Sequence, residues 1–305
     1  MIAADTTSLT EASRALPGKG GAAVALSSVP TPIGEALFLV DSALFVAGAI
    51  VLVILVIRFL ARREDPLRAA PPRPNVFRED SVALVVVVYL VAALGLSLCM
   101  SALAFEDDAV VTSIVVGSGA QVAGAVACLV LTSRQFEGGV RRLMSGPAAG
   151  LQRRGLGLAA ALSVAGVGLC PAVGALTVWT VTQFAAGYRP GGHPTLDALE
   201  QGQPTATVAA LWAGALLVAP VAEELFFRGV LQTVLVGLLR SRWWGIAAAS
   251  LAFGFVHLSQ PHAVPALVLL GVLIGYVFER TGSLLPAVVI HVLFNGKTLI
   301  WEALL

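Results

Sequence analysis

The amino-acid sequence predicts an all-α fold, a polytopic membrane bundle of about eight transmembrane helices. Hydrophobic residues make up 57% of the 305 residues and charged residues only 12%, whereas soluble domains average about 25% charged residues. The mean hydropathy is +0.88, and the apolar residues gather in stretches near the length of about 20 that spans a bilayer. The formal net charge of +1 argues against nucleic acid as a partner, because no basic surface accumulates.

Eight stretches are predicted to cross the membrane. In chain order they cover residues 37–60, 82–104, 110–133, 157–184, 206–226, 244–258, 264–279 and 284–304. The fifth continues past its acidic residues to about Leu239, and Pro220 is expected to kink it. The sixth and seventh are short and are joined by a turn at residues 259–262.

Basic residues predict how these helices are oriented. Most of the 19 Lys and Arg residues lie in alternate loops, at 58–78, 134–154, 240–242 and 280, and loops rich in Lys and Arg stay in the cytoplasm. Both termini are therefore expected outside. The Gly- and Ala-rich composition favours a high-GC bacterium, and so the protein is expected in the bacterial inner membrane.

Three regions are expected along the chain. Residues 1–36 are rich in small and polar residues and predict a flexible N-terminal tail. Residues 37–186 carry the first four transmembrane helices, with a Pro- and Arg-rich cytoplasmic linker at 61–80. Residues 205–305 form the remaining membrane domain, which holds the polar residues described next.

Six polar residues interrupt the apolar sequence of this last domain. They are Glu223, Glu224, Arg228, His257, His291 and Asn295. An ionisable residue at membrane depth costs about 2.5–3.5 kcal/mol on insertion scales, and the default interpretation is a functional site that faces protein or water. The set contains one acid more than a simple ion pair requires, together with two histidines and an amide, which is typical of a catalytic site.

Helical geometry divides the acidic residues into two roles. Glu224 and Arg228 are four residues apart and share a helix face, so they are expected to pair. Glu223 lies about 140° around the helix from Arg228 and must meet other neighbours, as a candidate general base. The alternative is one structural ion-pair network that contains all three residues.

The histidines lie on two further predicted helices. Phe253 and His257 are four residues apart, as are His291 and Asn295, so each pair shares a helix face. Each could serve only as a helix-packing hydrogen bond, worth about 0.6 kcal/mol in membranes. Polar residues on three separate helices make a common site the better interpretation.

The ordered motifs resemble the CPBP family of intramembrane endopeptidases, which groups CAAX prenyl proteases and bacteriocin-processing enzymes. The family pattern is Glu-Glu-x-x-x-Arg, then Phe-x-x-x-His, then His-x-x-x-Asn, and this chain has it at 223–228, 253–257 and 291–295. The resemblance covers about residues 205–300. It implies an intramembrane endopeptidase with its catalytic membrane domain at 205–305, acting on a peptide or membrane-protein substrate within the lipid bilayer.

The resemblance also implies a role for each polar residue. Glu223 and His257 would hold and activate a water molecule, and His291 and Asn295 would donate to the oxyanion that forms at the attacked carbonyl. Glu224 and Arg228 would shape and lock the site. Phe253 would line the pocket, with ordinary core packing as its alternative. The motifs contain no serine or cysteine, which favours direct attack by water.

The resemblance favours catalysis without a cofactor or metal. The alternative is zinc, for which Glu223, His257 and His291 would be the ligands. Three other functions stay open: a catalytically silent membrane scaffold, a bacteriocin self-immunity protein and a proton-coupled transporter. The transporter is the weakest of these, because the acidic motif has no counterpart in the first half of the chain and many transporters are built from repeats.

Overall fold

The computed structural model describes residues 31–62, 65–68, 70–72, 77–102, 109–147, 149–185, 188 and 204–304. Over these residues the secondary structure is helical and contains no strand. Seven helical segments are long and apolar enough to cross a membrane. The all-α polytopic membrane bundle predicted from composition is therefore confirmed.

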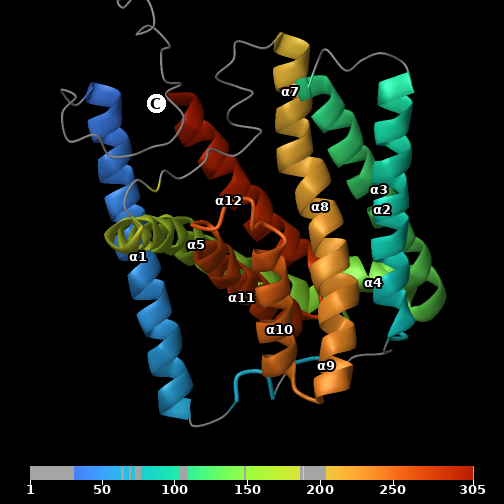
Figure 1. The fold of residues 1–305 in the computed structure, drawn as a ribbon. Helices are drawn as coiled ribbons and strands as arrows, with labels where there is room; N and C mark the ends of the chain where they lie inside the picture. The colour runs from blue at the N-terminus through green and yellow to red at the C-terminus, as the bar shows by residue number, and fades with distance from the viewer. Residues whose placement is uncertain are drawn as a thin grey trace, which may run out of the picture.

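The seven candidate spans follow the predicted order. Six are single helices: α1 (Pro32–Arg62), α2 (Asp80–Ala102), α3 (Ala109–Gln135), α5 (Ala149–Phe184), α11 (Val264–Thr281) and α12 (Leu284–Leu304). The seventh is a continuous run composed of α7 (Thr205–Ala213), η2 (Gly214–Val218), α8 (Ala219–Glu224), η3 (Leu225–Gln232) and α9 (Thr233–Leu239). Figure 1 shows this run passing through the height of the molecule. A short helix, α4 (Gly139–Ser145), precedes α5.

The predicted sixth span, residues 244–258, is wrong as a membrane-crossing helix. It corresponds to α10 (Arg242–Phe255), whose 14 residues extend about 21 Å at 1.5 Å per residue. The hydrocarbon core is about 30 Å thick, so this helix is too short to cross it. The chain leaves α10 through successive turns at residues 256–263 and returns along it as α11.

The N-terminal boundary of the first helix also differs from the prediction. Helix α1 begins at Pro32, so residues 32–36 are helical rather than part of the tail. The Thr31 side-chain oxygen accepts a hydrogen bond from the Gly34 backbone N–H at 3.1 Å, which caps the helix, and proline is favoured at the first helical position. The remainder of the predicted tail, residues 1–30, lies outside the described residues.

The helix that carries the acidic motif passes Pro220 without ending. Gly214–Val218 and Leu225–Gln232 are π-helical, with hydrogen bonds from residue i to i+5 that open the helix turn. Pro220 has no backbone N–H and disturbs the α-helical ladder, and the widened turn before it carries the helix past this position. Such π-helical stretches are frequent at functional sites.

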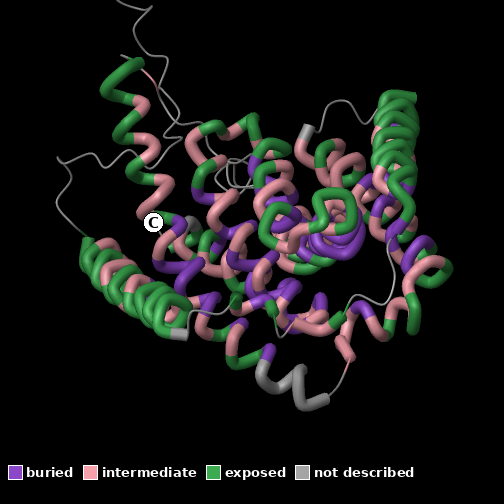
Figure 2. Tube along the Cα trace, turned by 90° about the horizontal axis from the view of Figure 1, so that it is seen from below, coloured by how far each residue is buried: buried purple, intermediate pink, exposed green. Residues whose placement is uncertain are grey.

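The core lies between the C-terminal helices and α5. Helix α5 packs against α1, α11 and α12, and α10 packs against both α11 and α9. Buried residues make up 56% of the α11 window but only 6% of those in α1 and α2. Figure 2 shows the buried residues gathered in the middle of the molecule, with exposed helices at its margins. The polar motifs therefore lie on the buried helices.

Candidate active site

Glu224 and Arg228 form the ion pair that their spacing predicts. Arg228 Nη1 lies 3.0 Å from Glu224 Oε1, and the two side chains are 1% and 0% exposed. Arg228 Nη2 also donates to the Gly271 backbone carbonyl at 3.4 Å, and the guanidinium lies 4.6 Å from the centroid of the Phe253 ring. The charge is thus compensated by a carboxylate, a carbonyl and an aromatic face.

Glu224 has a second partner that sequence spacing did not predict. His291 Nδ1 lies 2.7 Å from Glu224 Oε1. A carboxylate oxygen accepts hydrogen bonds, so this contact assigns a proton to Nδ1 of His291 and directs Nε2 away from Glu224. The carboxylate therefore joins Arg228 on its own helix to His291 on α12, and it fixes the imidazole ring.

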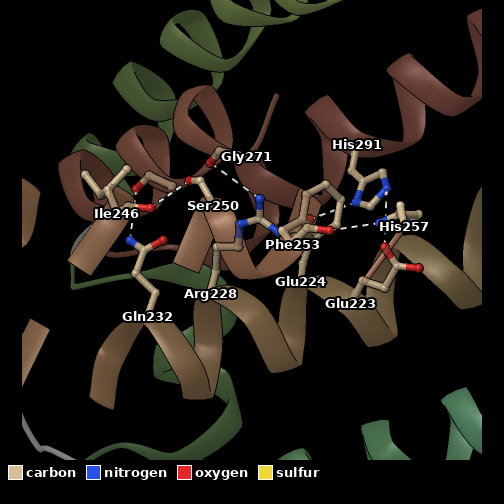
Figure 3. Close-up of polar contacts among 11 residues, drawn as sticks. Glu223, Glu224, Arg228, Gln232, Ile246, Ser250, Phe253, His257, Gly271 and His291 are labelled. Carbon is tan, nitrogen blue, oxygen red and sulfur yellow. Dashed lines mark hydrogen bonds and ion pairs between the residues drawn. The ribbon is translucent and has the colours of Figure 1, made fainter. Parts of the chain in front are cut away.

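Glu223 faces the other side of the same imidazole. Its Oε2 lies 3.8 Å from His291 Nε2, and its Oε1 accepts a hydrogen bond from Gln121 Nε2 on α3 at 3.4 Å. The side chain keeps 19% of its surface exposed. Figure 3 shows Glu223 turned toward His291 and His257, while Glu224 and Arg228 point along the adjacent face. The predicted separation of the two acids is therefore confirmed.

Phe253 brings the two histidines together. Its ring centroid lies 5.2 Å from that of His257 and 5.7 Å from that of His291, both in edge-on arrangements. His257 follows the end of α10, and its Nδ1 lies 2.8 Å from the Phe253 backbone oxygen. A carbonyl only accepts, so this contact assigns the proton to Nδ1 and leaves Nε2 of the neutral ring as an acceptor. Glu223 also interacts electrostatically with His257.

Asn295 contacts a different element. Its Nδ2 donates to the Ala215 backbone carbonyl at 2.9 Å, within the π-helical stretch η2. One of the two amide hydrogens of Asn295 is thus engaged in helix packing, and the other remains for a ligand. The structure brings Glu223, His257 and His291 together, and it places Asn295 one helical turn beyond His291 on α12.

The residues considered as zinc ligands do not form a metal-binding group. Within the part of the chain that the structure describes, no three His, Cys, Asp or Glu side chains are arranged to hold a metal ion. The Nδ1 of His291 is already committed to Glu224, and that of His257 to a carbonyl.

One contact to the site comes from a region where the sequence analysis identified no functional residue. Gln121 lies on α3, outside the resemblance to the family, and reaches Glu223 across 102 positions of sequence. The available signal was the same as for the motifs: an amide side chain in an otherwise apolar span. It is less conspicuous there, because α3 also carries several serine and threonine residues.

Fold and site together define a helical membrane protein with a buried acid–histidine–arginine cluster between its membrane helices. Comparison of the sequence with family models finds a match over the part of the chain that holds this cluster. Residues 205–296 match the family described as "Type II CAAX prenyl endopeptidase Rce1-like". This match confirms the resemblance found in the motifs, and it covers all six polar residues from Glu223 to Asn295. Helices α1–α5 lie outside it. No curated protein and no solved structure matches the chain.

Proposed function

We propose that this protein is an intramembrane endopeptidase that hydrolyses peptide bonds with a water molecule activated by Glu223 and His257. The observation that carries the proposal is the division between the acids. Glu224 is held by Arg228 and His291, whereas Glu223 has no basic side chain of the described residues within hydrogen-bonding distance and keeps partial exposure. A carboxylate in this position is suited to accept a proton from water. The family match over residues 205–296 supports the same chemistry.

His257 assists in holding the water. Its Nδ1 bonds to the Phe253 carbonyl, so Nε2 of the neutral ring is free to accept a hydrogen bond from the water that Glu223 deprotonates. Peptide-bond hydrolysis by this route forms a bond from the water oxygen to the carbonyl carbon. The proton taken by Glu223 then passes to the leaving amine when the carbon–nitrogen bond breaks.

His291 and Asn295 supply the donors for the oxyanion. Asn295 has one amide hydrogen beyond the one that binds Ala215, and it can donate without a change of protonation. His291 already carries a proton on Nδ1 toward Glu224, so a donor role at Nε2 requires the doubly protonated ring. Preorganised donors of this kind are often the largest single contribution to acyl-transfer catalysis.

The proposal extends to location and cofactor. We place the protein in the bacterial inner membrane with its N-terminus outside, because the Arg-rich loops mark the cytoplasmic side. The site is proposed to open toward that side, to act on a peptide or membrane-protein substrate, and to work without a metal.

A catalytically silent scaffold is the second candidate function. It is favoured by the contacts in which the motif residues serve the fold itself: the Glu224–Arg228 pair, the Arg228 bond to the Gly271 carbonyl and the Asn295 bond to Ala215. In a scaffold these contacts would be the whole reason for the motifs, and Glu223 would be dispensable.

Substitution of Glu223 separates the two functions. Glu223→Gln replaces a base by an amide of the same size, and membrane-protein termini in the native host would be compared between this variant and wild type by mass spectrometry. New termini that disappear with Glu223→Gln identify the cleavage site. Glu35→Gln, an exposed acid in the first turn of α1, is the matched control. Identical termini in all three strains would contradict the protease.

A further inference from the structure

Helix α3 lies outside the part of the chain that matches the endopeptidase family, yet it supplies a direct contact to the candidate base. The Gln121 side chain donates from Nε2 to Glu223 Oε1 at 3.4 Å. The other oxygen, Oε2, faces His291 Nε2 at 3.8 Å. An amide from the N-terminal helices and an imidazole from α12 thus meet opposite oxygens of one carboxylate.

The position of Gln121 is set by close packing of α3. This helix packs against η2, α8 and η3, the elements that carry the acidic motif. Ala120, the neighbour of Gln121, is fully buried. Three residues before Gln121, on the same face, the Ser118 hydroxyl lies beside Gly214, at 3.4 Å from where a Cβ would be, which is van der Waals contact. The amide is therefore delivered by a packed helix rather than by a loop.

A carboxylate with one immobilised oxygen has a defined direction for the other. A Glu side chain rotates freely about its last bond, and Arg228 cannot restrain Glu223, because it is paired to Glu224. Among the described residues, the hydrogen bond from Gln121 is the contact within 3.5 Å that sets the plane of the Glu223 carboxylate. Small errors of placement at a reacting group are costly, about 10²-fold for roughly 1 Å.

We propose that Gln121 is a positioning residue of the hydrolytic site, which orients the Glu223 carboxylate so that Oε2 faces the water and His291. This inference rests on the proposed protease function. It also gives the N-terminal helices a part in the site, because α3 supplies a hydrogen bond to Glu223 from outside the family-matching region.

Gln121→Met tests the role of the amide, because it keeps the length of the side chain and removes the donor. We expect kcat to fall about tenfold to a hundredfold with KM unchanged, on an internally quenched peptide that carries the cleavage site found in the native host. Gln121→Glu replaces the donor by an acceptor and is expected to lower kcat at least as far. Thr132→Val, at a fully buried position on the same helix, is the control for disturbed packing and should leave kcat unchanged.

A spectroscopic measurement tests the contact without any substrate. The infrared difference spectrum between wild type and Glu223→Gln isolates the carboxylate bands of Glu223. The same difference measured in a Gln121→Met background should show these bands at shifted frequencies. Bands that coincide in the two backgrounds would overturn the inference. Hydrolysis abolished by Glu223→Gln but unchanged by Gln121→Met would overturn it while the proposed function stands. Hydrolysis that survives Glu223→Gln would remove the proposed function and the role of Gln121 with it.

Discussion

Helices α1 and α11 are both apolar enough to cross a membrane, but α1 lies at the margin of the bundle and α11 lies in its core. The α1 window has a mean hydropathy of 2.9 and is 6% buried, whereas the α11 window has 1.6 and is 56% buried. The more hydrophobic helix is the more exposed one. Lipid tails are as apolar as leucine, so burial against protein brings no hydrophobic gain, and close packing and polar contacts hold the helices together.

The glycines of α11 show how such packing is achieved. A Cβ on Gly271 would lie 3.0 Å from Cβ of Ser250 on α10, and one on Gly275 would lie 2.7 Å from Oε1 of Gln232 in η3. A side chain at Gly271 would push α10 away, and one at Gly275 would displace the Gln232 amide. Helix α1 by contrast meets α12 through polar side chains, because Asp41 binds Lys297 Nζ at 2.8 Å and Trp301 Nε1 at 2.9 Å.

One ion pair from each of these two regions follows the same contrast. Glu224 and Arg228 are 0% and 1% exposed, and Asp41 and Lys297 are 38% and 12% exposed. A charge enclosed by protein that loses its partner is left uncompensated, whereas a partly exposed lysine on a membrane helix can extend its ammonium toward the interface. The Glu224–Arg228 pair should therefore contribute much to the unfolding free energy, and the Asp41–Lys297 pair should contribute little.

The largest effect is expected from Glu224→Gln. It leaves Arg228 buried without its charge partner and His291 without its carboxylate, and breaking a buried pair costs about 3–5 kcal/mol. Glu223→Gln should instead leave the unfolding free energy nearly unchanged while hydrolysis is lost. Thermal unfolding of both purified variants measures the difference, and equal losses of stability would contradict the division of labour between the acids.

Asn295→Ala should act on catalysis rather than on the fold. Loss of one oxyanion donor lowers kcat by about 10²–10³ with little change in KM. The loss should be constant across pH, because an amide donates without changing protonation state. A variant with normal kcat but a lowered unfolding temperature would show that its bond to Ala215 is the whole role of Asn295.

Asp41→Asn should have a small effect. Polar contacts between membrane helices average about 0.6 kcal/mol, and Lys297, in the C-terminal half of α12, can extend its ammonium toward the interface when Asp41 is replaced. The unfolding free energy should therefore fall by about 1 kcal/mol or less, with hydrolysis retained. A loss as large as that of Glu224→Gln would mean that α1 belongs to the core energetically, despite its exposed surface.

Prolonged chelation should have no effect on hydrolysis. Under the proposed mechanism Glu223 and His257 act on water without a metal, so activity measured before and after treatment with a chelator should agree. Activity that is lost to the chelator and restored by added zinc would recast Glu223, His257 and His291 as ligands. The candidate active site would then be a metal centre rather than a general-base site.

Sequence periodicity and hydropathy were sufficient for much of this protein. Long apolar stretches predicted the helical membrane class, since a lipid environment requires every backbone polar group to be satisfied within the segment. The spacing of Glu223, Glu224 and Arg228 predicted which acid pairs with the arginine, because contacts along one helix follow from its turn. The short α10 was misjudged as a span, since an apolar stretch does not show that the helix ends at Phe255, after only 14 residues.

Contacts between helices could be decided only by the tertiary structure. Nothing in the chain order indicates that His291 bridges Glu224 and Glu223, that Asn295 reaches the widened turn at Ala215, or that Gln121 lies against Glu223. These pairs are 67, 80 and 102 positions apart, and their meeting depends on which faces of separate helices pack together. The sequence determines the chemical groups and their places on each helix, and three-dimensional packing determines which of those groups form one site.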